Sequence, residues 1–414
     1  MNKITVTKRN GSKVELTIEK WQAQIAKICS GIADVSQSMI EIKSQPQFYD
    51  NITTSEIDEI TLRAIVNLID VDANPDVGHT NYQYVAGKQR LSMLRKDVYG
   101  QYEPPHLYTI VKKNIEVGLY TSELLDWYTV DEWNKMNDML DHSKDESYSY
   151  AAIEQLIEKY LVRNRATKEI YETPQVRYMI AAATVFHKEE PATARMKYIK
   201  EYYNAASDGL FTLATPVLAG LGTPTKQFSS CVLIRSDDDL DSIFASGEMM
   251  AKYASKRAGI GLEIGRLRPL GSPIRGGEIM HTGLIPFLKK WFGDLRCCSQ
   301  GGIRNASATI TFPIWHYQFD DLIVLKNNQG TEETRVRHLD YSVVLSAFFW
   351  RRFKNKENIT FFDPNEVPDL YEAFYTDTAV FEELYTKYEK DSGIRKKTMA
   401  AEEVFRGGLL KERT

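Results

Sequence analysis

The sequence predicts a chain in which an α+β region precedes an α/β region, and three observations support this fold class. A short alternating segment with a tight turn opens the chain, and helical periodicity follows it. The middle of the chain is helical in pattern. From about residue 211, short apolar segments alternate with glycine-rich turns and helices, which is typical of a parallel sheet. We therefore predict three domains, at residues 1–100, 101–210 and 211–414.

The first domain is predicted to combine a β-hairpin with a small helical bundle. The pair Asn10-Gly11 is a strong turn signal between two alternating segments. Thr53 stands three residues before Glu56, a spacing that caps the start of a helix. A later helix is expected at about residues 81–98. The first helix is indicated by apolar side chains at helical spacing, namely Trp21, Ile25, Ile28 and Ile32.

The second and third domains differ in their sequence patterns. Residues 128–140 and 181–209 have helical periodicity, and a proline-marked boundary precedes this region. Beyond it we predict short apolar strands, which are "FTLATPVLAG" at 211–220, "SSCVLI" at 229–234 and "SATITFPIW" at 307–315.

Composition and charge exclude several classes of protein. The net charge of −4 and the pI near 6.1 argue against a broad nucleic-acid-binding surface, which needs a basic stripe. The first residues have no apolar signal core, and no apolar run reaches the roughly 20 residues that a membrane span needs. We expect a cytoplasmic protein that binds neither nucleic acid nor membrane. No Cys/His spacing typical of a metal site occurs, so we expect no metal in this chain.

The four cysteines indicate reduced thiols and no disulfide scaffold. Cys29 lies on the apolar face of a helical pattern, and we predict that it packs in a core. Cys231 follows two serines and precedes "VLI", so we expect it at the mouth of a buried strand. A thiol in that place either fills space as a small apolar group or meets a ligand, and its position leaves both interpretations open. Cys297 and Cys298 are adjacent.

Two glycine-rich segments carry arginines that suit phosphate. The segment 259–278 fails the dinucleotide pattern, because the third glycine would fall on Ile264 and glycine arrives one residue later. Tight turns around a strand would explain its glycines. Its arginines favour an anion site, as does the similar composition of 297–309. The hairpin tip, with Lys8, Arg9 and Lys13, is either a solvated charged turn or a triphosphate contact.

Many stretches in one order resemble the large subunit of class I ribonucleotide reductase, especially the bacterial and T-even phage type. They are "VTKRNGSK", "YGQYEPP", "SYAA", "KYLVRNRATKEIYE", "TPVLAG", "TPTKQFSSCVLI", "KRAGIGLEIGRLRPLGSPIRGGE", "CSQGGIRNASAT", "VLKNNQG" and "RVRHLDY". The resemblance implies an N-terminal ATP-cone, a helical domain and the first half of a ten-stranded α/β barrel, incomplete in this chain.

The resemblance also implies an activity, which is the reduction of ribonucleoside diphosphates to deoxyribonucleotides by thiyl-radical chemistry. A thiyl radical takes the 3′ hydrogen of the ribose, and two other thiols supply reducing equivalents and form a disulfide. By resemblance Cys231 is one of that redox pair, and Thr215 and Ser230 contact the substrate. The thiol would then stand at a strand mouth because the 2′-hydroxyl of the substrate must reach it.

Allosteric effectors, namely ATP and deoxynucleoside triphosphates, are implied at two sites. In the family the specificity effector lies at the dimer interface, and residues 298–307 match the loop that relays its identity. Base and sugar contacts align with Asp238, Asp239 and Leu240, and phosphate contacts with Arg268 and Arg275. The overall activity site of the ATP-cone aligns with Lys8, Arg9, Lys20, Thr54 and Lys96.

Three positions in the cone depart from the family pattern. Val14 replaces a polar contact, and Asp58 and Met93 stand where some relatives carry histidines. These changes remove hydrogen-bond donors and add a negative charge near a triphosphate. We therefore expect inhibition by dATP to be weak or absent.

The resemblance implies several partners. In the family, about the same length of protein again follows, with the radical cysteine and the disulfide partner of Cys231. We expect a split large subunit whose C-terminal half is a separate chain, because a partial barrel leaves an exposed strand edge. Other expected partners are a radical-generating small subunit that holds the metal centre, thioredoxin or glutaredoxin, and a second large subunit in a homodimer.

Two other classes of function stay open. One is a non-catalytic nucleotide-binding remnant that regulates a complete reductase. The other is an interaction protein that keeps the fold and binds no nucleotide.

Overall fold

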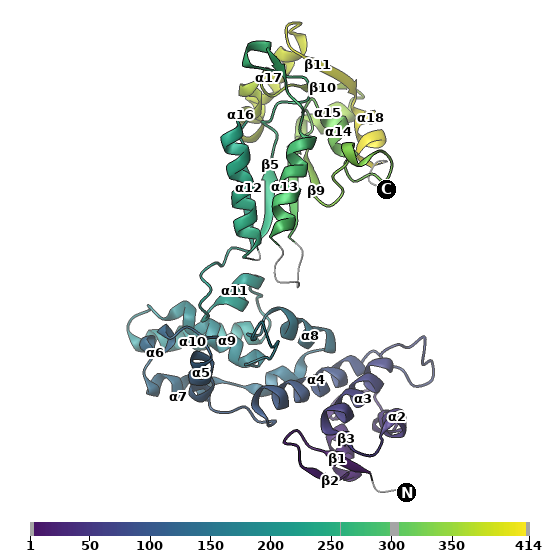
Figure 1. The fold of residues 1–414 in the computed structure, drawn as a ribbon, viewed down its shortest axis with the longest axis vertical. Helices are drawn as coiled ribbons and strands as arrows, with labels where there is room; N and C mark the ends of the chain where they lie inside the picture. The colour runs from purple at the N-terminus through teal and green to yellow at the C-terminus, as the bar shows by residue number, and fades with distance from the viewer. Residues whose placement is uncertain (1–3, 257, 299–305, 411–414) are drawn as a thin grey trace. The chain divides into compact units, whose positions relative to one another are not determined.

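The computed structural model describes residues 4–256, 258–298 and 306–410, and the chain divides into two compact units, Met1–Phe228 and Ser229–Thr414 (Figure 1). The first unit opens with a three-stranded sheet of order β2-β1-β3. β1 (Thr5–Thr7) pairs antiparallel with β2 (Lys13–Glu15) and parallel with β3 (Ile52–Thr53). Gly11 takes a positive φ of 80° in the turn between β1 and β2, which confirms the predicted hairpin.

Four helices complete this part of the first unit. They are α1 (Ile18–Cys29), α2 (Gln37–Ser44), α3 (Thr54–Asn67) and α4 (Tyr82–Tyr99). The predicted cap of α3 is confirmed, because the Thr53 hydroxyl accepts from the Glu56 N–H at 3.1 Å and the Glu56 carboxylate accepts from the Thr53 N–H at 2.8 Å. Cys29 packs against the core of these helices, as predicted.

α4 belongs to two hydrophobic clusters. Val85 and Met93 pack in the core that also holds Trp21 and Ile25 of α1. Other α4 side chains, Leu91, Leu94 and Val98, pack with residues of α8 (Tyr150–Lys159). The same helix therefore contributes to the core of the cone-like part and to that of the helical part.

The rest of the first unit is helical. Its helices are α5 (Leu107–Glu116), α6 (Glu123–Trp127), α7 (Val130–Met139), α8, α9 (Pro174–Phe186), α10 (Ala192–Ser207) and α11 (Thr215–Gly220). The predicted strand at 211–220 is wrong, because "TPVLAG" forms α11. Pro216 stands in the first turn of that helix, where its fixed φ and missing N–H are tolerated. Leu218 and Leu221 pack against Ala181 of α9.

The second unit is built on a parallel sheet of order β4-β5-β8-β9. These strands are β4 (Cys231–Arg235), β5 (Gly259–Glu263), β8 (Ala308–Pro313) and β9 (Asp340–Val344). A hairpin of β6 (Pro273–Ile274) and β7 (Ile279–Met280) and an antiparallel pair of β10 (Asn358–Phe362) and β11 (Lys396–Ala400) accompany it. The parallel sheet confirms the predicted α/β architecture.

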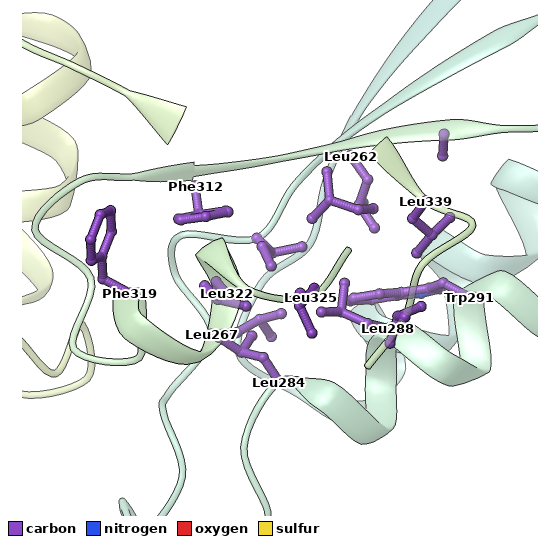
Figure 2. Packing of buried hydrophobic residues seen from close by; sticks show 14 of the residues in the cluster. Leu262, Leu267, Leu284, Leu288, Trp291, Phe312, Phe319, Leu322, Leu325 and Leu339 are labelled. Carbon is purple, nitrogen blue, oxygen red and sulfur yellow. The ribbon is translucent and has the colours of Figure 1, made fainter. Parts of the chain in front are cut away.

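Helices cover one face of this sheet. α12 (Leu240–Ala254) follows β4. α13 (Ile285–Cys297) precedes β8. Figure 2 shows Leu288 and Trp291 of α13 gathered with Leu262 of β5 and with Leu339. The Trp291 indole N–H donates to the Ile243 carbonyl at 3.1 Å and so ties α13 to α12.

Further helices follow β8, β9, β10 and β11. They are α14 (Phe319–Ile323), α15 (Ala347–Lys354), α16 (Pro368–Thr376), α17 (Thr378–Lys390), α18 (Ala401–Glu403) and a π-helical segment at Val404–Leu410. The tyrosines that contact the end of β5, described below, come from α16.

β4 is an edge strand in the part of the chain that the structure describes, and the prediction of a buried strand is wrong. Val232 and Ile234 pack toward the core, whereas Leu233 points to the other face and is 88% exposed. The alternation follows from the two-residue period of a strand. Three consecutive apolar residues are buried together only where a second layer covers the outer face.

His316 is fully buried beside the end of β8. Its Nε2 lies 2.9 Å from the Leu267 carbonyl, and its Nδ1 accepts from the Gln318 N–H at 3.1 Å. This pair of contacts requires a neutral ring with the proton on Nε2. Burial lowers the pKa of His316 to about 4.

We expect this buried histidine to make the second unit less stable in acid. The folded-state pKa lies below the ordinary value of 6.5, so the contribution is complete above pH 6.5 and is lost as pH falls toward 4. The stability difference between wild type and His316→Gln should therefore shrink by about 2 kcal/mol between pH 7 and pH 5, measured by urea unfolding. His338→Gln, at an exposed site, is the control. Parallel pH profiles for wild type and His316→Gln would contradict this assignment.

Candidate functional site

Cys231 begins β4 and its thiol is exposed. The strand pairs with β5 so that Cys231 stands opposite Gly259, and the Gly259 N–H donates to the Ser230 carbonyl at 2.8 Å. A Cβ added at Gly259 would lie 3.6 Å from the Cys231 sulfur. A methyl group at this position would be in ordinary van der Waals contact with the thiol, and Ser230 is the residue directly before Cys231.

Thr215 is described in the other compact unit, where it is the first residue of α11. Ser230 and Cys231 are therefore neighbours in the second unit, whereas Thr215 belongs to the first unit. The predicted relay loop, 298–307, falls for the most part outside the described residues. Cys298 follows α13, and Ser307 immediately precedes β8.

The residues predicted to hold the specificity effector gather at the opposite end of the same strands. Asp238 accepts from the Arg268 side chain at 2.6 Å and from its backbone N–H at 3.0 Å. Asp239 caps α12 through the Ser242 N–H at 2.8 Å, and Leu240 begins that helix in an exposed position. The carboxyl ends of parallel strands are where ligands bind in open α/β sheets.

Arg275 lies between β6 and β7 and has a left-handed backbone, with a φ of 52°. A non-glycine residue in that region is uncommon and marks a turn with a defined shape. The Arg268 guanidinium donates to the Pro273 carbonyl at 2.8 Å, at the start of the same hairpin. Arg268 therefore contacts the hairpin that carries Arg275, the other predicted phosphate-binding arginine.

A mostly buried carboxylate that sequence reasoning missed lies at the same end of the sheet. Glu263 ends β5, and burial raises its pKa. It accepts from the Gly265 N–H at 2.7 Å, from Tyr375 at 3.2 Å and from the Tyr371 hydroxyl. The cluster holds α16 against the end of the strand. Its one sequence signal is a charged residue that closes the apolar run "GIGLE".

In the first unit the structure brings Arg9 and Lys96 together around Asp58. The Asp58 carboxylate lies 3.1 Å from the Lys96 amine and 3.4 Å from the Arg9 guanidinium. Thr54 begins α3 one turn before Asp58. Lys8 and Lys20 are exposed, in the hairpin turn and on α1.

The other two positions that depart from the family pattern lie in different surroundings. Val14 is exposed on β2, and Met93 is buried in the cone core. The glutamines that contact Asp58, Gln24 and Gln89, were not predicted from the sequence.

Within residues 4–256, 258–298 and 306–410 no group of three or more His, Cys, Asp or Glu side chains could hold a metal ion. Nor does any helix of those residues have the length and apolar character to cross a membrane.

Comparison with known proteins assigns all three regions of the chain. Residues 4–97 match the ATP cone domain, 146–226 the all-alpha domain of ribonucleotide reductase and 229–409 its barrel domain. The chain belongs to the ribonucleotide reductase large-subunit family. The cone, the helical domain and the partial barrel domain that the sequence predicted are thereby confirmed.

Named relatives agree with this assignment. The chain is 47% identical to the ribonucleoside-diphosphate reductase subunit alpha of Haemophilus influenzae, over all of this chain and 54% of the relative. It is 47% identical to subunit alpha of reductase 1 of Escherichia coli, over 97% of this chain and 52% of the relative. Identity to the phage T4 subunit alpha is 41%, over 98% and 53%. The chain spans about half the length of these curated relatives.

The cysteines of this chain are expected to differ sharply in reactivity. Burial raises the pKa of Cys29 to about 11, which makes its thiolate fraction near neutral pH about 100-fold smaller than that of an ordinary thiol. Brief treatment with iodoacetamide at pH 8, read by peptide mass spectrometry, should label the exposed Cys231 and Cys297 and leave Cys29 unlabelled. Full labelling after denaturation is the control. Labelling of Cys29 as fast as Cys231 would contradict the structure.

Proposed function

We propose that this chain supplies the first redox cysteine and the effector-binding residues of a ribonucleoside-diphosphate reductase. The observation that carries the proposal is the exposed position of Cys231, which begins edge strand β4 opposite Gly259. Membership of the reductase family supplies the chemistry that such a thiol serves.

In the proposed reaction, a thiyl radical outside residues 1–414 takes the 3′ hydrogen of the ribose and later returns it. The 2′ C–O bond breaks, and the oxygen leaves as water. Cys231 and a second thiol give up two electrons and two protons and become a disulfide. Ser230 and Thr215 contact the substrate in this scheme. Thioredoxin or glutaredoxin then reduces the disulfide for the next turnover.

Nucleotide effectors are proposed at two places. The match to the ATP cone domain supports nucleotide binding by the first unit, with Arg9 and Lys96 as phosphate ligands. In the second unit, Arg268 and Arg275 supply guanidinium groups, and Asp238, Asp239 and Leu240 the base and sugar contacts. ATP and deoxynucleoside triphosphates are the effectors. The partners are a second large subunit and the small subunit that holds the metal-radical centre.

The rest of the barrel is proposed to add to the outer side of β4. Leu233 is the most exposed large hydrophobic side chain among the described residues, and an edge strand with an exposed apolar side chain favours further pairing or packing. That a separate chain supplies this half, as the resemblance led us to expect, stays a prediction.

We expect Cys231→Ser to abolish turnover. In an assembly completed with the C-terminal half and the small subunit, CDP reduction should fall by at least about 100-fold, because one member of the dithiol is missing. Cys297→Ser removes another exposed thiol and should keep activity within about twofold. Unchanged turnover in Cys231→Ser would refute the redox role. Nucleotide binding without turnover in every completed assembly would instead favour a regulatory remnant.

A second prediction concerns assembly. Leu233→Asp should weaken co-purification of the chain with the C-terminal half by at least about tenfold, because a carboxylate would be buried without a partner. Leu210→Asp, at a similarly exposed leucine of the first unit, should leave co-purification unchanged. Equal recovery with both variants would place the contact elsewhere.

A further inference from the structure

The carboxylate of Asp58 is fully occupied by donors from three segments of the cone. One oxygen lies 3.1 Å from the Lys96 amine and 3.4 Å from the Arg9 guanidinium. The other accepts from the Gln24 and Gln89 side-chain amides, each at 3.3 Å. The Asp58 side chain is 6% exposed. Donors thus converge on it from the hairpin, from α1 and from α4.

This arrangement leaves the two proposed phosphate ligands without spare charge. Arg9 is shared between Asp58 and Asp97, whose carboxylate lies 3.2 Å from its second amino group. Two cations therefore face two carboxylates, and the four charges sum to zero. A triphosphate that binds Arg9 and Lys96 must approach a buried negative charge or displace it.

The two carboxylates are not equivalent. The Asp97 side chain is 57% exposed, and an ion pair in such a place contributes little because water and salt screen it. Asp58 is buried, so its charge depends on Arg9 and Lys96 for compensation. Withdrawing those partners toward a ligand leaves an uncompensated buried charge, which is strongly unfavourable.

We infer that Asp58 is a built-in counter-anion that occupies the cationic centre of the cone and keeps its affinity for nucleoside triphosphates low. The inference rests on the proposed nucleotide site of the cone and adds a residue that determines its affinity. An internal carboxylate holds the place that a ligand phosphate would take, so the cone of this chain responds weakly to cellular triphosphates.

The test is titration calorimetry of the full chain with ATP and with dATP. Every sample carries Arg268→Ala, which weakens the proposed effector site of the second unit, so that the heat reports the cone. Asp58→Asn keeps the shape of the side chain and removes its charge, and it should bind at least about tenfold more tightly. Asp97→Asn removes a charge from the same arginine at the surface and should change the affinity by less than about threefold.

A further variant ties any gain to the cationic centre. Adding Lys96→Met to Asp58→Asn should return the affinity to the parent value, because the released amine is what binds phosphate. Thermal unfolding of each variant shows that it is folded. Should Asp58→Asn fail to fold, Asp58→Ala replaces it in the same comparison.

The outcomes separate this inference from the proposed function. Equal affinity of the parent and folded Asp58→Asn, with measurable binding in both, overturns the role of Asp58 and leaves the cone a nucleotide site. Similar gains in Asp58→Asn and Asp97→Asn assign the effect to net charge and also overturn it. Binding by none of the variants at millimolar nucleotide refutes the cone as a nucleotide site, and this inference with it. The catalytic proposal is tested independently through Cys231.

Discussion

The parallel pairing of β4 with β5 determines where both proposed sites of the second unit lie. The register sets Cys231 opposite Gly259 at one end and Arg235 opposite Glu263 at the other. Five residues of extended chain separate these ends by about 13 Å. The Cys231 thiol and the proposed effector residues that follow β4 and β5 therefore lie at opposite ends of these two strands of the sheet. The packing of α12 and α13 on that sheet, joined by Trp291, keeps this geometry fixed.

The cone in the first unit differs from this sheet, because polar side chains contact one another inside its small helical core. Asp58 and Gln89 are buried there. They hydrogen-bond to each other, and residues of the hairpin and α1 complete their hydrogen bonding. Buried polar groups of this kind are stable when every member has a partner. Because the donors around Asp58 already have partners, few of them are left to bind an added anion.

Local chemistry explains which features could be predicted from the sequence. The Asn10-Gly11 turn and the Thr53–Glu56 cap depend on residues a few positions apart, and both formed as predicted. The segment "TPVLAG" failed because its apolar run is compatible with a strand or a helix, and Pro216 together with packing on α9 favoured the helix. Short apolar runs carry no period that separates the two states.

Burial and long-range pairing could not be read from the sequence. Whether Leu233 is covered depends on a second layer that no local pattern encodes. Asp58 and Lys96 are 38 positions apart, and the family resemblance associated both with one ligand without showing that they would bind each other. The Glu263 cluster joins residues more than 100 positions apart, so only the fold reveals it.

The position of α4 in two hydrophobic clusters has a mechanical consequence. Its side chains interlock with α3 through one face and with α8 through another, and packed helices move as rigid bodies. Lys96 and Arg95 are neighbours on this helix; the first binds Asp58 in the cone, and the second lies 3.6 Å from the buried Asp145 in the helical region. A rotation of α4 that disturbs one of these ion pairs therefore also strains the other. Motions of the cone and of the helical region are coupled through this one helix.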